Sequence, residues 1–217
     1  MVRTILPALR LFLLNLLRPV TELIGKVHMP FSVKAITEDE VHEALNLALP
    51  GMVFATRTRG QLDNLPIPGF WCHNATVEDS WHVVEATGEG VLSNGIFNFL
   101  LKKDYAVLLR PRFATVEQMA AAAAFIKDQI GAGYDYNFLD VVETEQEIKT
   151  SVVKDRRFYC SKLPWAAYRS VCGPDIPFTT RETLGVQTVV PSDYVNATKL
   201  WEVVWASSLA KPLLPKT

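Results

Sequence analysis

Two short runs rich in apolar and β-branched residues, 73–77 and 81–86, follow one another with only the polar triplet 78–80 between them. Runs of this length and composition on either side of a short polar break are typical of a β-hairpin. We therefore predict antiparallel pairing of the two runs. Further short apolar runs predict strands at 52–56, 105–110, 186–190 and 200–205.

Helices are indicated where a threonine is followed three residues later by Glu or Gln, the pattern of a capping box. Thr37 with Glu40 opens one such helix, which the next Pro-Gly pair ends, and Thr115 with Gln118 opens an alanine-rich helix over 119–130 that ends at the glycines beyond it. Helices and strands thus mix along the chain, and we predict the α+β class.

The amino-terminal stretch has a different pattern. Ile5–Leu17 is strongly apolar, but Arg10 interrupts it, so the run of about 20 apolar residues that a bilayer requires is missing. The spacing predicts an amphipathic helical segment over 1–30, followed by a single domain over 31–217. Its apolar side is expected to pack on the domain or on a second copy, or to contact a membrane surface through residues 1–27. A cleaved signal peptide is disfavoured, because Arg10 stands inside its apolar core.

Composition narrows the range of functions. The 22 basic and 23 acidic residues of this 217-residue chain give a net charge of −1, which excludes the basic footprint of a nucleic-acid-binding protein. Three cysteines are too few for a secreted disulfide framework, so a cytoplasmic or peripheral membrane location is favoured and the compartment itself is left open. A zinc site would need the scattered ligands Cys72, His73, His82 and Cys160, and we predict neither a metal nor another cofactor.

Cys160 is a candidate nucleophile because of a nearby proline. Pro164 is compatible only with the first turn of the helix predicted over 161–171, so this helix begins next to Cys160. The positive end of the helix dipole favours a thiolate there, and free backbone N–H groups can stabilise an oxyanion. The alternative is that Cys160 is a small buried apolar residue, as most cysteines are.

A base for this thiol is sought among the four histidines, of which His73 and His82 lie on the predicted hairpin. If the turn has three residues, His73 lies directly opposite Glu85 and on the same face, where the carboxylate could orient the imidazole. A two-residue turn would place Glu85 on the other face. The alternative is that neither residue is catalytic: His73 is then a half-buried histidine, and Glu85 is a solvent-facing strand residue.

Several segments, taken in order, resemble a known superfamily. They are Gly51-Met-Val-Phe-Ala-Thr-Arg, Gly69-Phe-Trp-Cys-His-Asn-Ala-Thr-Val, Val83-Val-Glu-Ala, Gly133-Tyr-Asp-Tyr-Asn-Phe, Tyr159-Cys-Ser-Lys-Leu and Val190-Pro-Ser-Asp. Their order resembles the circularly permuted branch of the NlpC-type cell-wall peptidase superfamily, the YiiX-like and lecithin:retinol acyltransferase-like proteins, over roughly residues 45 to 195. The resemblance implies a papain-like α+β fold, with an antiparallel sheet packed against helices.

The resemblance also implies roles for individual residues. Cys160 corresponds to the nucleophile, His73 to the base and Glu85 to the orienting residue. Tyr134 and Ser161 are weaker candidates for the substrate pocket or the oxyanion site.

Two positions depart from the family pattern. Lys162 stands where the cysteine helix usually carries a glutamate, and Met52 stands where an early strand usually carries an aspartate. Lys162 is expected to be an exposed lysine on the helix surface; the alternative is a positive charge near the cleft that suits a carboxylate-bearing substrate.

These observations favour a thiol-dependent hydrolase that acts through an acyl-enzyme on a small-molecule, peptide or lipid substrate. By resemblance, the substrates are peptide or acyl-lysine amides of cell-wall origin. One alternative is an acyltransferase or lipase that acts on lipid esters at a membrane. Another is an inactive binding module of the same fold, which a buried Cys160 or an averted His73 would favour. A membrane-associated scaffold built on Ile5–Leu17 and a homodimer are also left open.

Overall fold

The computed structural model describes residues 35–60, 67–136, 156–173, 176, 181–183 and 186–215. The predicted amphipathic helix over 1–30 lies outside these residues. Within the part of the chain that the structure describes, no helix is long and apolar enough to cross a membrane.

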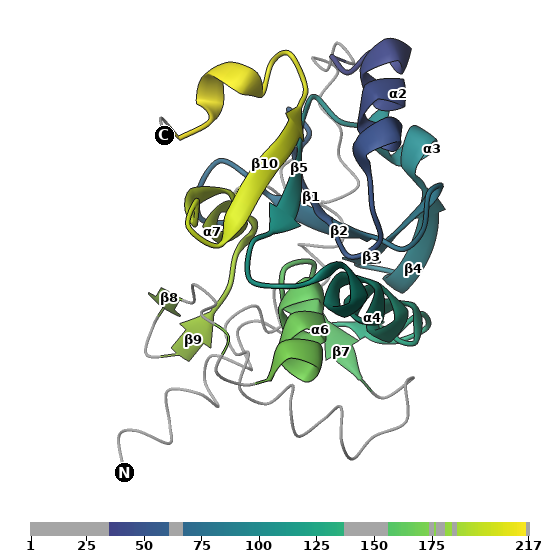
Figure 1. Ribbon diagram of the computed structural model, residues 1–217. Helices are drawn as coiled ribbons and strands as arrows, with labels where there is room; N and C mark the ends of the chain where they lie inside the picture. Colours follow the sequence, from purple (N-terminus) through teal and green to yellow (C-terminus); the bar gives the residue numbers. More distant parts are fainter. Residues whose placement is uncertain are drawn as a thin grey trace.

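A six-stranded sheet forms the centre of the molecule (Figure 1), with the strand order β10-β5-β1-β2-β3-β4. All neighbouring strands in it run antiparallel. The strands are β1 (Val53–Arg57), β2 (His73–Val77), β3 (His82–Thr87), β4 (Gly90–Gly95), β5 (Tyr105–Pro111) and β10 (Trp201–Ala206). The predicted α+β class with an antiparallel sheet is confirmed. Of these six strands, only β4 was absent from the prediction.

The register of the β2–β3 hairpin corrects the sequence prediction. Glu85 pairs with Ala75, not with His73, because the turn lies one residue later than residues 78–80: the backbone N–H of Glu78 donates to the carbonyl of His82, which leaves residues 79–81 between them. The register is therefore shifted by two residues. Since a shift of two leaves each side chain on the same face, His73 and Glu85 still share a face and are diagonal neighbours.

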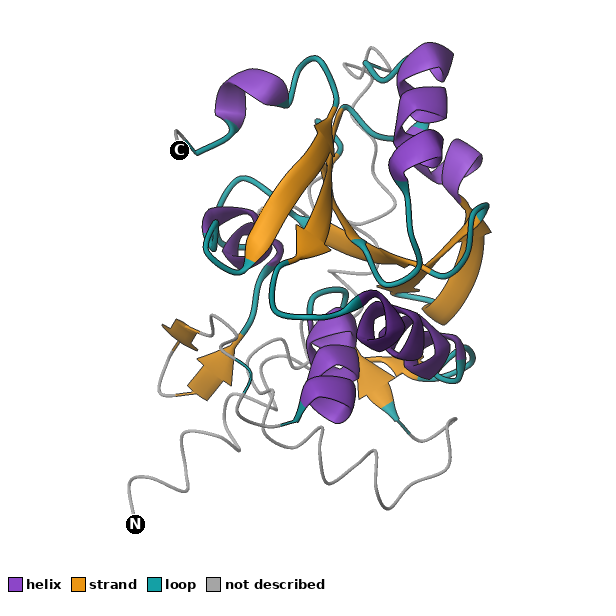
Figure 2. Ribbon diagram, viewed as in Figure 1, coloured by secondary structure: helices purple, strands orange, loops and turns teal. Residues whose placement is uncertain are grey.

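Helices cover the sheet from both sides (Figure 2). On one side lie α2 (Glu38–Leu47) and the short α3 (Ile96–Leu100), and on the other lie α4 (Val116–Lys127) and α6 (Lys162–Cys172). The predicted capping boxes are present at both helices: Thr37 caps α2 and Thr115 caps α4. Each box satisfies two backbone donors that the first turn leaves without partners.

Tight packing at Gly51 joins α4 and α6 to the sheet. Gly51 has a φ of +88°, and a Cβ at this position would lie 2.3 Å from the carbonyl oxygen of Met119 in α4. From α6, the Tyr168 hydroxyl donates to the carbonyl of Gly51 over 2.6 Å. Only glycine tolerates both this backbone conformation and this close approach. The two helices are thereby held against the start of β1.

Some of the remaining elements lie near the amino terminus of α6. A parallel pair, β6 (Gly133–Tyr134) and β7 (Arg157–Phe158), leads into this helix. A second pair, β8 (Arg181–Thr183) and β9 (Val186–Thr188), precedes α7 (Pro191–Asn196), and a 3-10 helix (Lys211–Leu213) follows β10. The Tyr194 hydroxyl of α7 donates to the carbonyl of Ser161 over 2.6 Å. Elements that precede and follow α6 in the sequence thus meet at its first turn.

Candidate active site

Cys160 lies immediately before α6, as the position of Pro164 predicts. Ser161 is the N-cap residue and Pro164 is in the first helical turn, where its missing N–H has no intrahelical partner to lose. The Cys160 thiol is only 6% exposed. Its Sγ atom lies 3.8 Å from the Ser161 hydroxyl and 4.0 Å from the carbonyl oxygen of Cys72.

His73 contacts both of its predicted partners. The Cys160 side chain acts on the imidazole and raises its pKa, and the Nε2 atom of His73 lies 2.5 Å from Oε2 of Glu85. Because Nε2 is occupied by the carboxylate, the other ring nitrogen, Nδ1, is left for the thiol. The ring also packs against Phe99 of α3, with 6.3 Å between centroids. His73 therefore interacts with both Cys160 and Glu85.

Glu85 is buried, and both of its oxygens have partners. While Oε2 faces His73, Oε1 accepts a hydrogen bond of 2.7 Å from the Asn94 side chain on β4. The expectation of a solvent-facing Glu85 is therefore wrong. Asn94 was missed because β4 was not predicted; the Gly-Glu-Gly turn at 88–90, between two apolar runs, was the signal for a second hairpin.

The electrostatics of these groups favour an ion pair. Burial alone lowers the pKa of His73, but hydrogen bonds and negative charge from Cys160 and Glu85 raise it to about 9. Burial raises the pKa of Glu85, yet His73, together with Lys103 and Asn94, lowers it to about 2. Burial also raises the pKa of Cys160, whereas His73 and the Asn74 N–H bring it below its ordinary value. These shifts favour the imidazolium form of His73 and the carboxylate form of Glu85, and they make the thiolate of Cys160 more favourable than that of an ordinary cysteine.

Ser161 and Tyr134, the weaker candidates for the substrate pocket or the oxyanion site, lie in different parts of the structure. Ser161 lies beside the thiol, at the N-cap of α6. Tyr134 is half-buried on β6, and its ring packs on that of Tyr136, with 5.0 Å between centroids. Its strand pairs with β7, which leads into Cys160. A role for Tyr134 in lining the pocket stays a prediction.

Lys162 differs from its expected placement. Its side chain is buried, not exposed on the helix surface, and Nζ lies 2.7 Å from Oδ2 of Asp135. Burial of an ammonium group requires such a partner, because an unpaired charge is costly away from water. Asp135 follows β6 directly, and its backbone N–H donates to Phe158 of β7. The ion pair therefore ties α6 to the strands that lead into Cys160.

Two of the four residues considered as scattered zinc ligands have other partners. Cys72 Sγ accepts a hydrogen bond from Arg57 over 3.1 Å, and His82 pairs with Asp79 at the hairpin turn. Among the described residues, no group of three or more His, Cys, Asp or Glu could hold a metal ion.

Comparison with known proteins gave one match. The model of the permuted papain-like amidases of the YaeF/YiiX type, peptidase family C92, matches residues 50–212. Neither the search of curated proteins nor that of solved structures gave a match. The matched range begins just before β1 and contains Cys160, His73 and Glu85.

Proposed function

The chain belongs to the YaeF/YiiX family of permuted papain-like amidases, and from this premise we propose that it is a thiol-dependent amidase. In the proposal Cys160 is the nucleophile, His73 the base and Glu85 the residue that orients His73. The observation that carries it is the placement of His73, which hydrogen-bonds the Glu85 carboxylate and whose pKa is raised by both Glu85 and the Cys160 thiol. A nucleophile, a base and an orienting group in this arrangement are what nucleophilic catalysis requires.

The first half of the reaction forms an acyl-enzyme. The thiol proton has passed to His73 in the resting ion pair, and the Cys160 thiolate attacks the amide carbonyl carbon. The tetrahedral oxyanion is stabilised by backbone N–H groups at the start of α6, which precede the first intrahelical hydrogen bonds. The carbon–nitrogen bond then breaks, His73 gives its proton to the leaving amine, and a thioester remains on Cys160.

The second half hydrolyses this thioester. His73, now neutral, takes a proton from water, and the resulting hydroxide attacks the thioester carbonyl. The carbon–sulfur bond breaks, the carboxylic acid leaves, and the thiolate and imidazolium pair is restored. Glu85 stabilises the positive charge of His73 and holds the ring in one orientation throughout, since it is anionic at neutral pH.

We propose peptide or acyl-lysine amides as substrates, in line with the amidase description of the family. Lipid esters remain the alternative, because a thiolate attacks an ester carbonyl by the same steps. One observation favours a second function: Cys160 is only 6% exposed, as expected for a binding module that has lost turnover. The orientation of His73 toward the thiol favours the enzyme instead.

The test combines thiol labelling with turnover. Iodoacetamide alkylation is followed peptide by peptide from pH 5 to 9, and fluorogenic acyl-lysine amides, dipeptide amides and short-chain esters are assayed in parallel. Cys172 is the internal control, because it is partly exposed and burial raises the pKa of its thiol. Cys160→Ala is the matched inactive variant and Cys172→Ala the matched neutral one.

The expected result is labelling of Cys160 below neutral pH, turnover that is lost in Cys160→Ala and kept in Cys172→Ala, and an acyl adduct on Cys160 in the intact mass. Faster cleavage of esters than of amides would favour the lipid-ester alternative. If Cys160 labels no faster than Cys172 and no substrate turns over, the binding-module function replaces the enzyme.

A further inference from the structure

Glu85 uses one carboxylate oxygen for His73 and the other for Asn94. We infer that Asn94 is a positioning residue, which holds the Glu85 carboxylate in the plane that directs Oε2 at the imidazole. Asn94 touches neither the thiol nor, in the proposed reaction, the substrate, and it acts only through Glu85. The inference rests on the proposed function, since it concerns the same site.

The position of Asn94 follows from the sheet register. Asn94 on β4 pairs with Val83 of β3, so it lies diagonally next to Glu85, two residues further along β3 on the same face. The distance from Nδ2 to Oε1 is 2.7 Å, which is short for a hydrogen bond to an amide nitrogen and typical of a charge-assisted one. Because an ionised carboxylate can only accept, the amide nitrogen must be the group that faces it.

The chemistry of asparagine suits this position. Glu85 is only 8% exposed, so water cannot readily replace a missing donor at Oε1. The charged groups that face Glu85 are His73 from β2 and Lys103, which follows α3. A second cation at Oε1 would compete with His73 for the negative charge, whereas a neutral amide anchors the oxygen and leaves that charge for the imidazole. Without the amide, the carboxylate is free to turn away from Nε2.

The test uses the reactivity of the Cys160 thiol, which needs no known substrate. Asn94→Leu keeps the size of the side chain and removes the donor, while Asn94→Gln keeps a donor on a longer arm. The matched control is Ser93→Ala, because Ser93 is the adjacent, exposed residue of β4 and its hydroxyl donates to Glu78. Thermal unfolding of each variant is recorded alongside.

We expect Asn94→Leu to lower the alkylation rate of Cys160 at pH 6 by roughly tenfold, which corresponds to a rise of about one unit in the apparent thiol pKa. Asn94→Gln should recover part of this rate, and Ser93→Ala should leave the pH profile unchanged. A loss of stability alone would not move the midpoint of the profile. An Asn94→Leu profile equal to that of the parent overturns the inference and leaves the proposed function standing.

A second measurement uses the parent protein and so does not depend on the folding of a variant. The carboxamide N–H signals of Asn94 in proton–nitrogen NMR spectra should shift with the same midpoint as the His73 ring, because the two residues share one carboxylate. Signals that do not respond to His73 overturn the inference. If Cys160 of the parent shows no enhanced reactivity at all, the proposed function fails, and the inference fails with it.

Discussion

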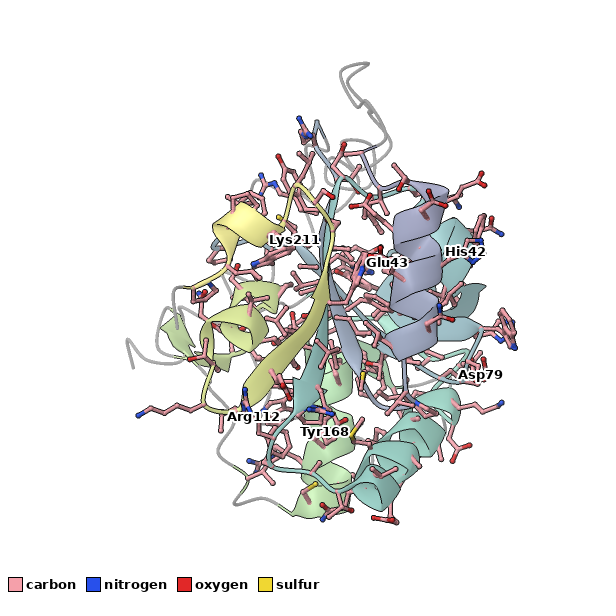
Figure 3. All side chains as sticks on the ribbon, turned by 45° about the horizontal axis from the view of Figure 1, so that its top comes forward. His42, Glu43, Asp79, Arg112, Tyr168 and Lys211 are labelled. Atoms are coloured by element: carbon pink, nitrogen blue, oxygen red, sulfur yellow. The ribbon has the colours of Figure 1, made fainter. Side chains whose placement is uncertain are left out.

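The β2–β3 hairpin carries two pairs of a histidine and a carboxylate in contrasting surroundings. His73 and Glu85 lie 2.5 Å apart, with side chains that are 21% and 10% exposed. His82 and Asp79 lie 3.0 Å apart, with side chains that are 50% and 47% exposed. Figure 3 shows Asp79 at the edge of the molecule. The same residue types therefore occur in the interior and at the surface of one hairpin.

The two pairs differ in their surroundings, and not in the pairing of a histidine with a carboxylate. In the inner pair both groups gain further partners, Cys160 for His73 and Asn94 for Glu85, and the pKa of His73 rises to about 9. In the outer pair, Asp79 accepts hydrogen bonds from the backbone N–H groups of Trp81 and His82, both over 2.8 Å, and so stabilises the turn. Water screens the remaining charge. A charge pair becomes chemically useful only where burial and further partners act on it.

Lys162 and Asp135 extend this comparison to a buried pair outside the hairpin. Lys162 is as thoroughly removed from water as Cys160, but its pair with Asp135 joins α6 to the end of β6 and takes no part in the proposed reaction. Substitutions in these buried pairs are therefore expected to change stability or reactivity more than substitutions in the exposed pairs.

Lys162→Met should destabilise the fold by about 3–5 kcal/mol, because it leaves the Asp135 carboxylate without its partner beside the helix. Urea unfolding at neutral pH measures this loss. Arg110→Met is the exposed control, since its pair with Glu202 is at the surface, and it should cost less than about 1 kcal/mol. The double variant Lys162→Met/Asp135→Leu should recover most of the loss. Equal effects of Lys162→Met and Arg110→Met would show that burial does not distinguish these pairs.

Glu85→Gln should change the acid dependence of stability. The folded protein keeps Glu85 ionised down to a pKa of about 2, against an ordinary value of 4.5. Between these values the unfolded state binds more protons, so this contribution, up to about 3 kcal/mol, is present above pH 4.5 and is lost as the pH falls through 2. Unfolding measured at several pH values should show a shallower slope in Glu85→Gln. Asp79→Asn should change the slope far less, and an equal change would contradict the comparison.

His73→Ala should slow alkylation of Cys160 at pH 6 on the order of a hundredfold, because an ordinary thiol with a pKa near 8.5 is almost fully protonated there. His82→Ala, on the same hairpin, should leave the rate unchanged, since His82 pairs with Asp79 at the exposed turn. Mass spectrometry of the labelled peptides gives both rates. Similar rates in the two variants would mean that His73 does not activate the thiol.

Local signals along the chain determined most of the helices and strands. Thr37 and Thr115 cap their helices as the sequence predicts, because a capping box needs only residues three positions apart. Pro164 placed Cys160 at the start of α6 for a similarly local reason, the missing N–H of proline. The order of motifs also indicated the family, which the match over residues 50–212 shows.

Only the tertiary structure decided the surroundings of these residues. The position of the hairpin turn set the register that made Glu85 a diagonal neighbour of His73, and the pairing of β4 placed Asn94 next to Glu85. Lys162, which the sequence led us to expect at the surface, is buried and forms an ion pair with Asp135. Partners distant in the sequence and the removal of water depend on packing, which the spacing of residues does not encode. Thus residues and their order determined the candidate nucleophile and base, and packing determined the charges they carry.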